Sequence, residues 1–284
     1  MQDSIRSTVT RRLWGLRGRR GQYFRGGLRL ALVLLFVMHG LAGQAHSFAG
    51  AGPFTHINIT TKALDRFAHE TGWEVDIYCS ELLNQFAVTS DSVEGMKQFT
   101  YHCDSNDLAG CSFRLDQFKS QANRAYVREQ SLRRMGMALH IVQDFYSHSN
   151  WVETFGFTML RAPIEEFKLY APPIDVQSGQ FPDIFPDIGA QLACFLVPED
   201  QWDKFIFGAT HSCMNKDSNI TFRGARVIRN GFGFTYHELA GHYAVNHSVE
   251  LIKYFYRHNP WFKTCLRPQI FTAGCNKRFL DWLH

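Results

Sequence analysis

The sequence predicts an all-α protein built as a single helical domain. Apolar residues recur at helical spacing over residues 55–68, near the start of the body of the chain. A second helical stretch runs from about Leu115 to about His148 without a proline, and a third runs from about Tyr236 to Tyr256. The chain shows no strong alternation of polar and apolar residues, which is the pattern of a half-buried strand.

Residues 1–47 have the pattern of a secretory signal peptide. Eight arginines and a single acidic residue occupy the first 45 positions. The uncharged run from Leu30 to Gln44 is shorter than the ~20 residues of a membrane-spanning helix, and small residues follow it. We therefore predict a mature domain over residues 48–284 that is secreted or periplasmic. An uncleaved signal anchor is the alternative.

The composition of the body excludes several classes of protein. With 45% hydrophobic and 14% aromatic residues, the chain is neither disordered nor collagen-like. Without the arginines and the one acid of the leader, it has 22 basic and 25 acidic residues, a formal charge of −3. No basic stripe is interleaved with aromatic residues, so a nucleic-acid groove is not indicated.

All seven cysteines follow the leader, which favours disulfides in an exported protein. The short spacings favour the pairs 103–111, 194–213 and 265–275, and leave Cys79 over. No two cysteines have the CxxC spacing, so a zinc site made of thiolates is not expected.

A long irregular, Pro-rich insertion is predicted between the second and third helical stretches. Six of the nine prolines lie within residues 163–198, and such runs cannot form the interior of a helix. We expect residues 155–230 to be irregular, and loops of this length are often functional.

The segment most informative about chemistry is residues 137–151. His140, Asp144 and His148 are spaced four residues apart, so their side chains project within an arc of about 80° on one helix face. Apolar neighbours surround them, which predicts a buried helix whose imidazoles and carboxylate need partners. A divalent metal ion is the simplest such partner, and nitrogen and oxygen ligands suit zinc.

Other segments contribute further candidate ligands. His56 begins the first helix, while Asp91 and His102 lie in polar stretches. His237 and His242 lie on the last helix, about 140° apart, so they cannot both face one site. Together these residues suggest a site for more than one metal ion.

Residues 138–153 resemble the Het-C family, which is related to a fungal heterokaryon-incompatibility factor. Four shorter blocks match the same family in the right order: residues 55–64, 101–104, 214–218 and 237–240. More distantly, the HxxxD step resembles the bacterial zinc-dependent phospholipases C and the fungal single-strand-specific nucleases. Those enzymes are all-α and hold three zinc ions in a cleft, so the resemblance implies a helical domain of the zinc phospholipase C type.

The resemblance also implies a role for each candidate ligand. His140 would bind one zinc ion and Asp144 would bridge two, with His102 and His56 completing the two sites. Asp91 would be a ligand or the general base. A third zinc ion would be held by His148 and His237.

This sequence departs from the family pattern in two places. The second histidine of the helix follows the aspartate after four residues, whereas the family enzymes use a longer interval. Gly241 stands where those enzymes have an acidic ligand, and Glu238 or His242 could substitute for it.

These patterns predict a secreted zinc-dependent phosphodiester hydrolase, with a phospholipase C acting on phospholipid or a membrane surface as the favoured form. Asp91 and Asp144 are the predicted catalytic residues, and Lys216 would bind the substrate phosphate. Aromatic residues of the insertion could accept acyl chains or pack in the core. The alternatives are a single-strand nuclease or nucleotidase, and a non-catalytic, metal-stabilised module that acts on membranes. No protein partner is implied.

Overall fold

The computed structural model describes residues 52–92, 98–155, 176–180, 211–228 and 233–269. All of them belong to one compact unit, Ala45–His284. The predicted signal peptide and the six clustered prolines of the predicted insertion lie outside the described residues.

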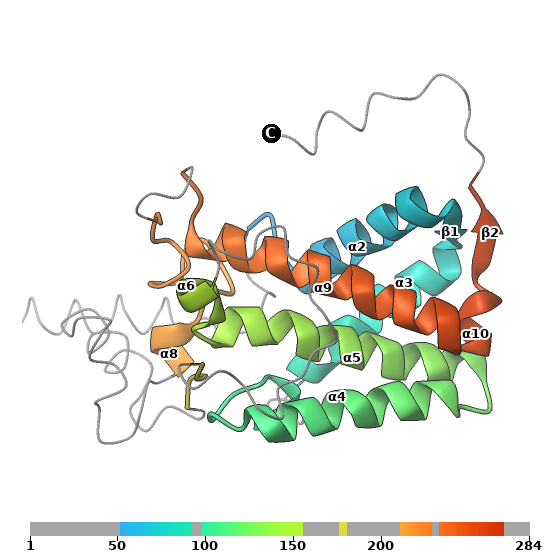
Figure 1. The fold of residues 1–284 in the computed structure, drawn as a ribbon, viewed down its shortest axis with the longest axis horizontal. Helices are drawn as coiled ribbons and strands as arrows, with labels where there is room; N and C mark the ends of the chain where they lie inside the picture. Colours follow the sequence, from blue (N-terminus) through green and yellow to red (C-terminus); the bar gives the residue numbers. More distant parts are fainter. Residues whose placement is uncertain (1–51, 93–97, 156–175, 181–210, 229–232, 270–284) are drawn as a thin grey trace, which may run out of the picture. The chain divides into compact units, whose positions relative to one another are not determined.

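The prediction of an all-α fold is confirmed, since helices make up most of the described chain (Figure 1). The long helices are α2 (His56–Thr71), α3 (Ile77–Ala87), α4 (Leu108–Asn123), α5 (Arg128–His148) and α9 (Tyr236–His258). The short ones are α6 (Trp151–Phe155), α8 (His211–Met214), α10 (Pro260–Lys263) and the 3₁₀ turns η1 (Thr89–Asp91) and η3 (Phe99–Tyr101).

Side-chain caps fix where the long helices begin. Thr55, Asp76 and Asp107 each accept a hydrogen bond from a backbone N–H in the first turn of α2, α3 and α4. Thr235 forms a reciprocal capping box with Glu238 at the start of α9. These caps place the first residues of α2 and α9, His56 and Tyr236, at defined points beside the core.

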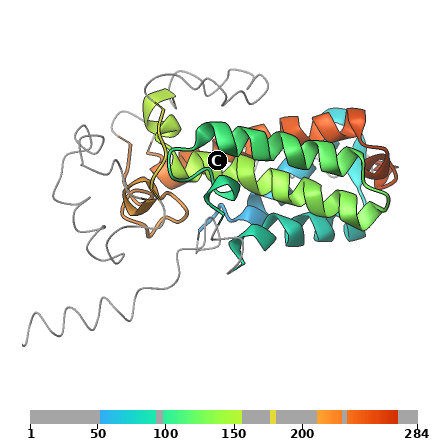
Figure 2. The same cartoon turned by 90° about the horizontal axis from the view of Figure 1, so that it is seen from below.

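Helix α5 lies at the centre of the unit. It packs against α3, α4 and α9, and α2 packs across α3 and α9; Figure 2 shows α4 and α5 side by side. Every residue from Met135 to His148 is buried, as the apolar surroundings of His140 and Asp144 predict. Gly136 lets α3 approach closely, because a Cβ there would lie 2.5 Å from Cβ of Phe86.

The second predicted helical stretch is two helices, because the chain turns back between α4 and α5 at residues 124–127. Neither glycine nor proline marks this turn in the sequence. Side chains from elsewhere instead bind carbonyl groups at the end of α4 and in the turn. Ser131 donates to the carbonyl oxygen of Ala122, and the indole of Trp261 donates to that of Ala125. Tertiary contacts therefore determine the break. The third predicted stretch is confirmed as α9.

Two short strands that the sequence pattern did not predict join the segment after α2 to the segment after α10. β1 (Trp73–Val75) pairs antiparallel with β2 (Leu266–Pro268), with Glu74 opposite Arg267. Beside this pair, Cys79 forms a disulfide with Cys265. The predicted pair 265–275 and an unpaired Cys79 are therefore wrong, because strand pairing brings together residues that are remote in sequence.

The predicted disulfide between Cys103 and Cys111 is confirmed. Cys213 is also disulfide-bonded, and its predicted partner Cys194 lies outside the described residues. The described parts of the predicted insertion hold only α8 and isolated bridges, such as Ser149 with Ser178. Among the residues that the structure describes, none of the helices is both long enough and apolar enough to cross a membrane.

Candidate metal centre

Five of the predicted ligands meet in the core. His56 comes from the first turn of α2, Asp91 from η1, His102 from the residue after η3, and His140 and Asp144 from α5. We call these five residues the His56 cluster. The side chains of His56, His140 and Asp144 are fully buried, whereas those of Asp91 and His102 are 8% and 7% exposed.

The two oxygens of Asp144 face different imidazoles. Oδ1 lies 3.2 Å from Nε2 of His56. Oδ2 lies 2.7 Å from Nδ1 of His102 and 2.9 Å from Nε2 of His140. Asp91 repeats this division at longer range: its Oδ2 lies 3.6 Å from Nε2 of His56, and its Oδ1 lies 3.8 Å from Nε2 of His140. In each carboxylate, therefore, one oxygen faces His56 and the other faces His140.

The outer nitrogens of two imidazoles are held by hydrogen bonds. Nδ1 of His56 lies 2.6 Å from Oε1 of Gln143, and Nδ1 of His140 lies 2.7 Å from the carbonyl oxygen of Ala87. Both partners can only accept, so Nδ1 carries the proton in each ring. In the neutral imidazole, Nε2 then presents its lone pair to the carboxylates, as a metal-ligating histidine does.

The charges within the cluster stabilise one another. Burial disfavours charge on His56, but the carboxylates of Asp144 and Asp91 outweigh it and raise the pKa of His56 to about 9. Burial likewise opposes the charge of Asp144, yet His140 and His56 hold its pKa well below the usual range. Positive charge for the ionised carboxylates can come from protons on the imidazoles or from a bound cation.

The cluster has the composition and the size of a metal site. One ligand atom from each of His56, Asp91, His140 and Asp144 can be chosen so that all four lie within 4.8 Å of one another. Neither carboxylate oxygen of Asp91 has a hydrogen-bond partner among the described residues, although both are buried. A cation would satisfy these oxygens. The group can therefore hold a metal ion.

A second group surrounds His148, which the resemblance had paired with His237. Nε2 of His148 lies 3.0 Å from Oδ1 of Asp217, and its Nδ1 lies 3.4 Å from Oδ1 of Asp104. Nδ1 of His211 lies 3.1 Å from each oxygen of Asp104. We call Asp104, His148, His211 and Asp217 the His148 cluster. Although burial opposes its protonation, the carboxylates of Asp104 and Asp217 raise the pKa of His148 well above its usual value.

Within the described residues, His237 contacts the loop after α8 and Phe54. Its Nδ1 donates to the carbonyl oxygen of Lys216 at 2.8 Å, and its ring packs edge-on against Phe54. Neither proposed substitute for the missing acidic ligand joins a cluster. Glu238 is engaged in the capping box, and His242 is exposed and contacts Phe54.

The position of the missing ligand is filled by an aromatic ring. A Cβ placed on Gly241 would lie 2.1 Å from the ring of Phe54. There is consequently no room for an acidic side chain at this position, so the departure from the family pattern has a packing reason.

Lys216 directly precedes Asp217 of the His148 cluster, and its predicted role in binding a substrate phosphate stays a prediction. Its ammonium group is fully buried and donates to the carbonyl oxygens of Ser149 and Met214. It also pairs with Glu153, which in turn accepts a hydrogen bond from Arg223. These contacts give Lys216 a structural role: it joins the loop after α8 to the end of α5.

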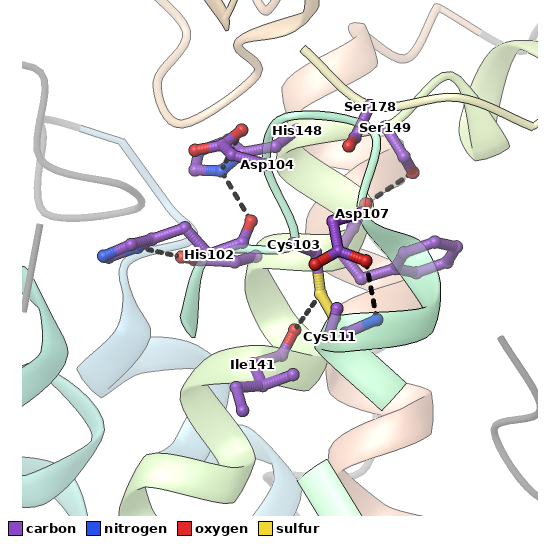
Figure 3. Close-up of a disulfide and its surroundings, with 12 residues drawn as sticks. His102, Cys103, Asp104, Asp107, Cys111, Ile141, His148, Ser149 and Ser178 are labelled. Atoms are coloured by element: carbon purple, nitrogen blue, oxygen red, sulfur yellow. Dashed lines mark hydrogen bonds and ion pairs between the residues drawn. A yellow bond between two sulfur atoms is a disulfide. The ribbon is translucent and has the colours of Figure 1, made fainter. Parts of the chain in front are cut away.

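Sequence reasoning missed three members of the His148 cluster. Asp104 and Asp217 lie inside blocks 101–104 and 214–218, which match the Het-C family. Their positions in these blocks could have marked them as candidate ligands. His211 lies outside every block, and no pattern marked it. The turn that carries Asp104 is clamped by the Cys103–Cys111 disulfide; Figure 3 shows the Asp104 carboxylate beside the His148 ring and the His102 ring pointing away from it.

Comparison with known families gives one partial match: the model of the VWA7 N-terminal domain matches residues 80–164. This range includes Asp91, His102, Asp104 and the whole of α5. It leaves out His56 and the segment that carries His211 and Asp217. Comparison with curated proteins and with solved structures gives no match.

Proposed function

We propose that this protein is a secreted zinc-dependent phosphodiester hydrolase, most simply a phospholipase C that cleaves phospholipid headgroups. The observation that carries the proposal is the position of Asp144. Its Oδ1 faces His56 while its Oδ2 faces His102 and His140, which is how a carboxylate bridges two metal ions. The resemblance of residues 138–153 to the Het-C family, and of HxxxD to zinc phospholipases C, supports the same reading.

The His56 cluster divides into two sets of ligands. His102 and His140 would hold one zinc ion together with Oδ2 of Asp144, and His56 would hold the second with Oδ1. Asp91 has one oxygen toward each set. Zinc in such a site lowers the pKa of a coordinated water and stabilises charge on a phosphoryl oxygen. Imidazole and carboxylate donors without thiolate suit this metal in a catalytic role.

Access to the cluster is restricted to one side. Only Asp91 and His102 have any exposed side-chain surface, so a phosphate ester would approach past these two residues. In this proposal Asp91 would accept a proton from the attacking water, in addition to its role as a ligand. The buried residues of α5 behind Asp144 exclude water from the other side.

The charge of the mature chain favours a lipid over a nucleic acid, since −3 with no basic stripe would repel a polyanion. The predicted leader and the disulfides support an extracellular or periplasmic location. Phe155, one of the aromatic residues of the insertion that could accept acyl chains, packs against Trp151.

One observation favours a second candidate function. Three of the five side chains in the His56 cluster are fully buried, which also suits a metal that only stabilises a membrane-acting module. This module would bind membranes without hydrolysing lipid.

The decisive experiment compares Asp144→Asn with the parent protein. Both are loaded with zinc and assayed on phosphatidylcholine micelles and on single-stranded DNA, with and without a chelator. We expect the substitution to lower phosphatidylcholine hydrolysis by more than about 100-fold, the scale of losing one charge-stabilising group in a catalytic site. Zinc content should fall as well.

Asp116→Asn is the matched control, because Asp116 is an exposed aspartate on α4 that forms an ion pair with Lys119 on the same helix. Near-parental turnover of Asp144→Asn with full zinc would refute the proposal. A parent that binds zinc but hydrolyses neither substrate would identify the protein as the non-catalytic module.

A further inference from the structure

The His148 cluster gathers its four side chains from three separate parts of the chain. Asp104 lies in the turn after η3, His148 ends α5, His211 begins α8, and Asp217 lies in the loop after α8. All four are buried, with residue exposures of 1–6%. A group of this kind has to be assembled by tertiary folding, and buried carboxylates are retained only where positive charge balances them.

Hydrogen bonds orient the two imidazoles. Nδ1 of His148 donates to the carbonyl oxygen of His102 at 3.0 Å, which leaves Nε2 facing Asp217. The amide nitrogen of Asn215 lies 3.3 Å from Nε2 of His211, and Nδ1 of His211 is the ring nitrogen that faces Asp104.

The charges of the cluster suit a divalent cation. Asp104 and Asp217 bring two carboxylates to neighbouring buried positions. A divalent cation matches both carboxylates while the imidazoles stay neutral.

The spacing of the donor atoms fits a metal ion of the size of zinc. Ligands 2.0–2.1 Å from a tetrahedral ion lie about 3.3 Å from one another. In the cluster, Nε2 of His148 is 3.0 Å from Asp217, and Nδ1 of His211 is 3.1 Å from Asp104. Single ligand atoms of Asp104, His148 and His211 can be chosen that all lie within 4.8 Å.

We propose that Asp104, His148, His211 and Asp217 form a separate binding site for a divalent metal ion that prefers nitrogen and oxygen ligands. The site differs from the pair His148 and His237 that the resemblance implied. It adjoins the His56 cluster, since the rings of His102 and His148 lie 6.4 Å apart between centroids. The proposal does not depend on catalysis by the His56 cluster.

The test is a metal count. The oxidised mature chain is stripped with a chelator and reloaded with Zn²⁺ or Co²⁺, and bound metal is measured by mass spectrometry and by the visible absorption of Co²⁺. We expect His211→Gln and Asp104→Asn each to lose one equivalent of metal, or to bind it ~10–100-fold more weakly, while the rest stays bound. Asp144→Asn should instead lose the metal of the His56 cluster.

Two controls match these substitutions: His242→Gln changes an exposed histidine and Asp116→Asn an exposed aspartate. Parental stoichiometry and affinity in both His211→Gln and Asp104→Asn would overturn the proposal and identify a metal-free ion-pair network. If the variants do not fold, anomalous diffraction from Co²⁺-loaded parent crystals decides. A peak between Asp104 and His148 supports the site, and a peak confined to the His56 cluster overturns it.

Discussion

Gln143 shows how one residue connects the proposed metal centre to the packing of the helices. Its carbonyl oxygen accepts the Nδ1 proton of His56, and its amide group donates to Thr60 and Ser248. These partners lie on α2 and α9, so the orientation of His56 is fixed by the same contacts that join three helices. Gln143 directly precedes Asp144 on α5. One turn of this helix therefore carries the proposed ligand Asp144 and also the residue that orients the proposed ligand His56.

His247 is a buried histidine that belongs to neither cluster. It lies on α9, and its Nδ1 is 3.0 Å from the hydroxyl of Tyr146. Burial, with a smaller contribution from the charge of Lys119, lowers the pKa of His247 to about 3. The folded protein therefore keeps this imidazole neutral, whereas the unfolded chain protonates it near pH 6.5.

This shift predicts how stability depends on pH. A pKa that is lower in the folded state gives a contribution present above pH 6.5 and lost as the pH falls from 6.5 toward 3. We expect a loss of about 2 kcal/mol between pH 7 and pH 4.5 from this residue. Denaturant unfolding at several pH values, in the presence of a chelator, should give a shallower acid limb for His247→Gln than for the parent. If stability fell equally steeply with pH in His247→Gln and in the parent, the low pKa of His247 would be contradicted.

At the scale of structural elements, the turn after η3 directs neighbouring residues into different clusters. His102 contacts Asp144, while Asp104 contacts His148 and His211. Cys103 between them has a φ of 53°, and Ser105 and Asn106 are also left-handed, at 60° and 55°. Such conformations cost energy in residues other than glycine, so the surrounding structure has to hold them. The disulfide to Cys111 is the covalent part of that support.

The two described disulfides should therefore differ in what their removal changes. We expect Cys103→Ser/Cys111→Ser to weaken metal binding by about tenfold or more, because the turn supplies a ligand to each cluster. Cys79→Ser/Cys265→Ser opens a link between residues 186 positions apart. It should lower the free energy of unfolding by about 2–5 kcal/mol and leave metal affinity unchanged. Calorimetric zinc titration and denaturant unfolding of both variants provide the comparison. Equal effects of the two pairs on affinity would argue against a specific role for the turn.

At the scale of the whole molecule, helical periodicity and local spacing were sufficient to predict the all-α class and the central helix. His140 and Asp144 share one helix face whatever the rest of the chain does, so their proximity follows from the sequence. The burial of α5 follows in the same way from its apolar surroundings.

What could not be predicted depends on contacts between remote segments. His211 has no local pattern that relates it to Asp104, and the two meet because the folded chain packs the start of α8 against the turn after η3. The pairing of β1 with β2 and the Cys79–Cys265 disulfide have the same origin, since short strands and long loops leave weak periodicity. The sequence shows that Gly241 stands where an acidic ligand was expected, but not why. The reason lies in the packing, because the ring of Phe54 fills the space that a side chain at this position would need.

Metal removal should destabilise the whole unit, because the proposed ligands of the His56 cluster join α2, η1, the turn after η3, and α5. A metal that binds only the folded state stabilises it by about 4 kcal/mol when its free concentration is about 1,000 times the dissociation constant. Buried carboxylates left without a cation would add to the loss. We therefore expect a chelator to lower the melting temperature of the parent and zinc to restore it. Asp144→Asn should respond less than the parent to either treatment, because only the metal of the His148 cluster remains, while Asp116→Asn should follow the parent. Thermal unfolding by circular dichroism, repeated over a zinc titration, measures these responses. A parent whose melting temperature is independent of zinc would show that both clusters are stabilised by protons alone.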